Sequence, residues 1–130
     1  CVAQDYTEST IWHQLAAEQG YVHSQLLLGF AYIKGTGVLQ DYVEAAKWIR
    51  KAAEQGNDNS QHQFGQMYHD GQGVLQNYIY AHMWFNLASA QGAYGAAEDR
   101  DSLAKNMTAE DISKAQALAR QCVRNEYKGC

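Results

Sequence analysis

The chain has 130 residues, with ten Lys or Arg against fourteen Asp or Glu, which gives a formal net charge of −4 and a sequence pI of about 5.6. These few, scattered basic residues exclude the clustered positive surface on which nucleic-acid binding depends. No apolar run approaches the roughly 18 residues that a membrane-spanning helix needs.

The sequence repeats itself every 36 residues. Its three tryptophans, Trp12, Trp48 and Trp84, are each 36 residues apart. The stretch 35–42 (Gly-Thr-Gly-Val-Leu-Gln-Asp-Tyr) returns at 71–78 as Gly-Gln-Gly-Val-Leu-Gln-Asn-Tyr. A fixed period of this length is typical of a solenoid, in which stacked units bury a continuous core and offer an extended surface to a ligand.

Residues 1–20 are predicted to form a partial first repeat. Cys1 has the phase of Gly37 and Gly73, so the sequence opens within a unit, and we expect it to belong to a longer array. A mature lipoprotein also begins with Cys, but here residues 2–6 lead directly into the repeat rather than into a flexible tether.

Residues 21–56 and 57–92 are predicted to be complete repeats, each with two antiparallel helices. The first, which we call the A helix, is expected over Val22 to Lys34 and again over Asn59 to Asp70, and glycine then closes it. Small residues on its inner face, Gly29 and Gly65, are expected to allow a neighbouring helix to approach closely.

The second helix of each unit, the B helix, is predicted to begin at a polar N-cap. Asp5, Asp41 and Asn77 occupy this phase of the repeat. Glu8 and Glu44 follow the two aspartates by three residues, which resembles a capping box.

Residues 93–130 depart from the repeat and are predicted to form a terminal capping unit. Arg100 and Asp101 stand where the earlier units have a Leu or Phe followed by Gly, so no further repeat can stack there in the same way. Thr108 is expected to cap a last helix, whose apolar side carries Ile112, Ala115, Ala119 and Cys122. We therefore predict an all-α protein, an α/α superhelical solenoid of antiparallel helix pairs with a C-terminal capping helix.

A family resemblance rests on residues that recur in the complete units. They are Ser24-Gln25, Leu28-Gly29, Tyr32, Gly35, Gly37-Val38, Asp41-Tyr42, Ala45, Trp48 and Ala-Ala-Glu-Gln-Gly at 52–56. This pattern resembles the Sel-like repeat, a mostly bacterial relative of the tetratricopeptide repeat, over residues 1–107. The resemblance implies an α-solenoid with the A helices on a concave surface and the B helices outside, acting as an adaptor that gathers other proteins. Many bacterial members are exported.

The two complete A helices, compared with each other, separate scaffold positions from candidate contact positions. Positions identical in both serve stacking, whereas positions that differ are free to face a partner. On this basis we predict partner contacts from Leu27, Phe30, Lys34, His62, Gln63, Gln66, His69 and Asp70. Packing within the array is the competing interpretation for the apolar members, and an ordinary solvated surface is the competing one for the polar members.

No catalytic residue, metal site or cofactor is predicted. His62 and His69 share a helix face but stand about 10.5 Å apart along the axis, too far for one zinc ion with ligands at about 2.1 Å. All three cysteines lie at the chain's ends, and no Gly-x-Ser-x-Gly motif is present.

Cys122 and Cys130 are eight residues apart. On a continuous helix they would stand about 12 Å apart, too far to bridge, but they can pair if the helix ends near Tyr127 and the chain folds back. Two free thiols are the alternative. The resemblance favours the disulfide, because one branch of the family has paired cysteines at similar spacing, and with it an exported, oxidising location. Cys1 is then free, paired elsewhere or lipidated.

The leading interpretation is a non-catalytic protein–protein interaction domain of an exported bacterial repeat protein, which binds another protein or a segment of one on the concave A-helix surface. A small-molecule or cell-wall-fragment binder, or a weak hydrolase, is the alternative, because some members of the disulfide-rich branch bind penicillin-like compounds. An inhibitor or immunity partner of a toxin is a third. A shallow open strip favours the adaptor, and a closed pocket with a perturbed carboxylate favours the enzyme.

Overall fold

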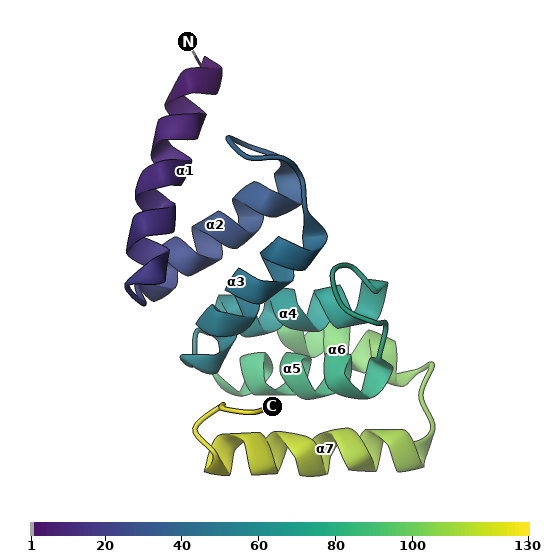
Figure 1. Cartoon of the computed structure of the whole chain (residues 1–130). Coiled ribbons are helices and arrows are strands. Elements are labelled where there is room, and N and C mark those ends of the chain that lie inside the picture. The colour runs from purple at the N-terminus through teal and green to yellow at the C-terminus, as the bar shows by residue number, and fades with distance from the viewer. Residues whose placement is uncertain (1) are drawn as a thin grey trace.

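The computed structural model describes residues 2–130, with side chains from residue 8 onward, and this part of the chain contains helices and no strand. The helices are α1 (Val2–Glu18), α2 (Val22–Lys34), α3 (Tyr42–Glu54), α4 (Asp58–Asp70), α5 (Tyr78–Ala90), α6 (Ala96–Ala104) and α7 (Ala109–Arg124). The A helices are α2, α4 and α6, and the B helices are α1, α3 and α5. Each of α2 and α4 packs against the B helix before it and the one after it, while α6 packs on α5 (Figure 1). The all-α solenoid expected from the repeat is confirmed.

A hydrogen-bonded turn joins each complete A helix to its B helix. Gly35 and Gly71 each have a φ of 70°, the left-handed conformation that closes a helix with little steric cost for glycine. Six residues after Gly35, the backbone N–H of Asp41 donates to the carbonyl of Tyr32 at 2.9 Å, and the next unit repeats this bond. The side chain of Asp41 then accepts from two N–H groups at the start of α3, as an N-cap does.

The prediction that Asp5 caps the first B helix is wrong, because α1 begins at Val2 and Asp5 lies inside it. In the complete units the start of the B helix is fixed by the bond from the cap residue's N–H, such as that of Asp41, to the preceding A helix.

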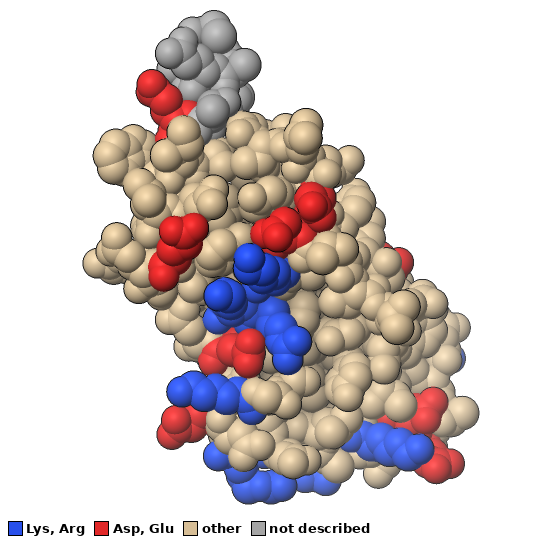
Figure 2. Space-filling view, in the orientation of Figure 1, with Lys and Arg blue, Asp and Glu red and all other residues tan. Residues whose placement is uncertain are grey.

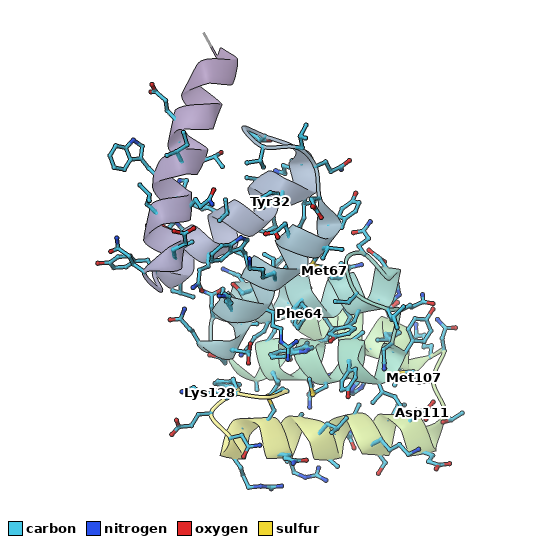
Figure 3. The ribbon with its side chains drawn as sticks, viewed as in Figure 1. Tyr32, Phe64, Met67, Met107, Asp111 and Lys128 are labelled. Atoms are coloured by element: carbon cyan, nitrogen blue, oxygen red, sulfur yellow. A yellow bond between two sulfur atoms is a disulfide. The ribbon has the colours of Figure 1, made fainter. Side chains whose placement is uncertain are left out.

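The core lies between α3, α4 and α5, where Phe64, Met67 and Trp84 are almost completely buried (Figure 3). The rings of Phe64 and Trp84 meet edge to face, with centroids 5.3 Å apart. Close approach depends on glycine, because a Cβ built on Gly65 would stand 2.7 Å from a ring carbon of Phe85. This is the close helix packing that the sequence predicted for Gly29 and Gly65.

The three repeated tryptophans differ in exposure because their covering helices differ. Trp48 and Trp84 are 5% and 0% exposed, whereas Trp12 is 71% exposed. Trp48 packs on Leu28 of α2, and the position that would cover Trp12 in the same way precedes residue 1. The interpretation of the chain as part of a longer array stays a prediction, and Cys1 lies outside the described residues.

The terminal unit departs from the repeat as expected. Arg100, in place of Leu or Phe, turns its guanidinium toward α5 and donates to Asn86 at 3.0 Å. Helix α7, capped by the side chain of Thr108, packs along α5 (Figure 1). It ends at Arg124, and a turn through residues 126 and 127, both with positive φ, brings the chain back.

In the structure a disulfide joins Cys122 and Cys130 across this turn, with Cα atoms 5.6 Å apart. The ring of Tyr127 faces Gly56, in the turn between α3 and α4. The C-terminal tail is thereby attached both to α7 and to the end of the preceding repeat.

Candidate functional site

The surface shared by the A helices is the candidate site. The 36-residue period places equivalent positions of α2, α4 and α6 on the same side of the array, so Leu27, Gln63 and Asp99 form one row and Phe30, Gln66 and Ser102 form another. Each row changes from apolar on α2 through neutral amide on α4 to polar or charged on α6. The three A helices thus place apolar, amide and polar or charged side chains next to one another.

Two adjoining hollows form one groove across these helices. The larger, of about 400 Å³, is lined by Leu26, Phe30, Asn59, His62, Gln63, Gln66 and Asp99. The smaller, of about 140 Å³, is lined by Gln66, His69, Phe85, Asp99, Ser102, Leu103 and Asn106. Since Gln66 and Asp99 border both hollows, the two are neighbours, and we call them together the groove.

The wall on α2 is apolar. Leu26 is 7% exposed, belongs to the core and lines the larger hollow. Phe30 is half-buried, with one side packed on the same core and another side lining the groove. This wall is therefore rigid and offers an aromatic surface to a ligand.

A hydrogen bond connects α4 to α6 at the groove. His62 Nε2 and Asp99 Oδ2 are 2.6 Å apart, with side chains 23% and 45% exposed. The imidazole also meets the edge of the Phe85 ring at a centroid distance of 5.6 Å. Because the ring packs on Phe85, the carboxylate of Asp99 is positioned by a buried part of α5.

A second polar cluster lies at the C-terminal end of α4. His69 Nδ1 and Asp70 Oδ1 are 2.7 Å apart, while Gln66 donates to the other oxygen of Asp70 at 3.1 Å. The ring of His69 stacks on Tyr78 with a centroid distance of 5.6 Å. Both oxygens of Asp70 thus already accept hydrogen bonds within the protein.

The structure brings five of the eight predicted contact residues to the groove. These are Phe30, His62, Gln63, Gln66 and His69. Leu27 is half-buried and does not line either hollow, and Lys34 and Asp70 are exposed at the ends of α2 and α4.

Other lining residues lie outside the eight predicted contacts. Asp99, Ser102 and Asn106 share the phase of Gln63, Gln66 and Asp70, and this phase predicts that they belong to the same concave strip. Asn59 and Phe85 carried no such signal, because Asn59 opens its helix and Phe85 belongs to a B helix.

Titratable groups behind the groove are buried. His82 of α5 is 3% exposed, and its Nδ1 has no hydrogen-bond partner among the described residues. Burial lowers the pKa of His82, the positive charge of Arg100 lowers it further, and Asp101 opposes the shift. Burial likewise raises the pKa of Tyr68, whose hydroxyl stays protonated.

Outside the groove, the described surface carries a group of basic side chains and two further hollows. Lys and Arg side chains gather over α3 in Figure 2, and α3 carries Lys47, Arg50 and Lys51. Two further hollows, of about 410 and 120 Å³, lie between α5 and α7 and are lined by no A-helix residue. Among the side chains of residues 8–130, no three His, Cys, Asp or Glu are grouped to hold a metal ion. No helix in the part of the chain that the structure describes is both long and apolar enough to span a bilayer.

Stacked helix pairs with a groove along the A helices define the class of the protein as an α-solenoid repeat protein, and such proteins bind ligands on an extended surface. The sequence matches the Sel1 repeat over residues 1–21, 22–57 and 59–92, and the chain belongs to the Sel1 repeat family. Proteins of this family generally mediate protein–protein interactions and are generally non-catalytic. No curated protein matches the chain.

Two solved structures resemble it. The first is c5321, a protective antigen present in uropathogenic Escherichia coli strains that displays an SLR fold, with a TM-score of 0.88 and 34% identity over 93% of this chain. The second is a Sel1 repeat protein from Oxalobacter formigenes, with a TM-score of 0.68 and 33% identity over 70% of this chain and 68% of the other. The present chain spans 27% of the length of c5321.

Proposed function

We propose that this chain is a non-catalytic adaptor module of an exported bacterial repeat protein, and that it binds an extended segment of another protein along the groove. The observation that carries the proposal is that two neighbouring hollows are lined by residues of α2, α4 and α6. Several lining positions, such as those of Phe30 and Gln66, differ between the repeats, whereas Gly29 and Gly65, which admit the neighbouring helix, are the same. Such a surface supports a specific partner on a common scaffold.

The openness of the groove supports an adaptor over a small-molecule binder or hydrolase. His62, Asp99 and His69 keep between 23% and 45% of their side-chain surface exposed. An enzyme pocket buries most of a small ligand, whereas an extended segment needs a long surface that is accessible from solvent.

Export is supported by two observations. The disulfide between Cys122 and Cys130 belongs to an oxidising compartment, and c5321, the similar protein, is described as a protective antigen.

Affinity capture with two matched variants tests the proposal. Phe30→Asp combined with Gln66→Glu adds two negative charges inside the groove. Val43→Asp combined with Gln116→Glu adds the same two negative charges at exposed sites on α3 and α7. A partner retained by the wild type and by the outer variant, but lost from the groove variant while circular dichroism shows it folded, is the expected result. Equal retention by both variants would overturn the assignment to the groove.

A further inference from the structure

We infer that the groove selects a segment that carries an apolar side chain and, a few residues away, a Lys or Arg side chain. The apolar group lies against α2, and the cationic group lies at Asp99 on α6. This inference rests on the proposed function and adds to it the chemistry and the direction of the partner.

Carboxylates outnumber basic side chains on the A helices. The A helices α2, α4 and α6 carry five carboxylates, on Asp58, Asp70, Glu98, Asp99 and Asp101, against two basic side chains, on Lys34 and Arg100. Arg100 is engaged by Asn86 and Asp101 on the side of α5, which leaves no cation of α6 facing the groove. The groove thus complements a positive ligand.

Asp99 is the carboxylate best placed to accept that ligand. Its Oδ2 accepts from His62, but within the described residues no side chain donates to its Oδ1. Asp70, by contrast, already uses both oxygens. Because Asp99 borders both hollows, a cation bound there is in reach from either one.

The opposite end of the groove is fitted to an apolar group. Leu26 and Phe30 supply its wall, and α2 carries no acidic residue. A charged ligand side chain placed here would lose hydration without gaining a partner, so the ligand's direction is fixed with its apolar residue at α2.

Amide side chains between these ends match the backbone of an extended segment. Asn59 and Gln63 line the larger hollow, and within the described residues neither side chain makes a hydrogen bond to another group. Each offers both a donor and an acceptor, which is what the N–H and C=O groups of a peptide backbone require. The extended backbone rises about 3.3 Å per residue, so a few residues suffice to pass from α2 to α6.

A synthetic positional-scanning peptide library, bound to the immobilised protein, tests the inference. The enriched peptide is then compared with versions in which Lys is replaced by Glu or by norleucine, using fluorescence anisotropy. We expect the Lys peptide to bind about fivefold more tightly than the norleucine peptide, the size of one partly exposed ion pair. Added salt should reduce this preference.

Three variants test whether the preference for the Lys peptide depends on the carboxylate of Asp99. Asp99→Asn should remove the preference for Lys and leave the norleucine peptide unaffected, and Asp99→Lys should reverse it in favour of the Glu peptide. Glu126→Gln, the same loss of charge in the exposed turn after α7, should change nothing. Thermal melting of each variant shows whether it is folded.

The outcomes separate the inference from the proposed function. A Lys preference that survives in folded Asp99→Asn, or no preference for Lys over Glu, would overturn the inference. If peptides still bind and are lost from the Phe30→Asp/Gln66→Glu variant, the groove remains the binding site and only its charge assignment fails. Absence of any bound peptide also overturns the inference, while the capture experiment decides the proposed function independently.

Discussion

Gly65→Ala is a sharp test of the packing, because two effects of opposite sign compete at this position. Ala has a higher helix propensity than Gly by about 1 kcal/mol, which alone would stabilise α4. The new Cβ, however, would stand 2.7 and 2.8 Å from two ring carbons of Phe85 and 3.2 Å from the carbonyl oxygen of Ala81. Ordinary carbon–carbon contacts lie at about 3.5–4.0 Å, so the helices or the ring must move by almost 1 Å.

This movement lowers the stability of the folded state, because the ring of Phe85 is enclosed by the rest of the protein. Phe85 is 1% exposed and cannot swing into solvent. Overpacking of this kind costs about 1–3 kcal/mol, and with a backbone oxygen among the obstacles we expect a cost near the top of that range. The net loss after the propensity gain is then about 1–2 kcal/mol, or a fall in Tm of roughly 5 °C.

Urea denaturation followed by circular dichroism measures this loss. Adding Phe85→Leu removes the ring, so Gly65→Ala should cost about 1 kcal/mol less in that background. A stabilisation by about 1 kcal/mol in the wild-type background would show that α4 and α5 are not in close contact, and the close-packed repeat geometry would be refuted.

Three further predictions concern stability. Trp48→Ala should cost about 3–5 kcal/mol by leaving a cavity under α2, and a variant that melts like the wild type would show that the repeat register is wrong. His82 has a lowered pKa in the folded state, so below about pH 6.5 the unfolded chain binds a proton that the folded chain does not. Stability should therefore fall toward lower pH by up to about 1.4 kcal/mol per pH unit, and His82→Leu should lessen this slope in urea titrations; an unchanged slope would contradict the assignment. Cys130→Ser should cost about 2–3 kcal/mol under oxidising conditions and little under reducing ones, whereas equal stability in both would argue against the disulfide.

The sequence predicted the repeated parts of the fold well, for physical reasons. A glycine that must adopt positive φ, such as Gly35, or that must admit a neighbouring ring, such as Gly65, has few substitutes, so its recurrence at 36 residues carries structural information. The cap at Asp5 was predicted wrongly because its helix start depends on a hydrogen bond to a preceding A helix rather than on the cap residue alone.

The groove could be predicted only in part. Positions that differ between α2 and α4 identified Phe30, His62 and Gln66, because period and phase are visible in sequence. The contact between His62 and Asp99 could not be predicted. It depends on how α6 is placed against α4, and α6 departs from the repeat pattern at Arg100 and Asp101. Leu27 lines neither hollow, because a difference between repeats does not by itself bring a side chain into the groove, and its contact with a partner stays a prediction.

Site-specific photo-cross-linking tests the central claim most directly. A photoreactive amino acid at Gln63, within the groove, is compared with the same residue at Gln116, exposed on α7. If the partner binds along the A helices, Gln63 should cross-link to one segment of the partner protein, and Gln116 should not. Cross-linking at Gln116 without cross-linking at Gln63, in a folded protein that retains its partner, would place the interaction on the outer face and contradict the account.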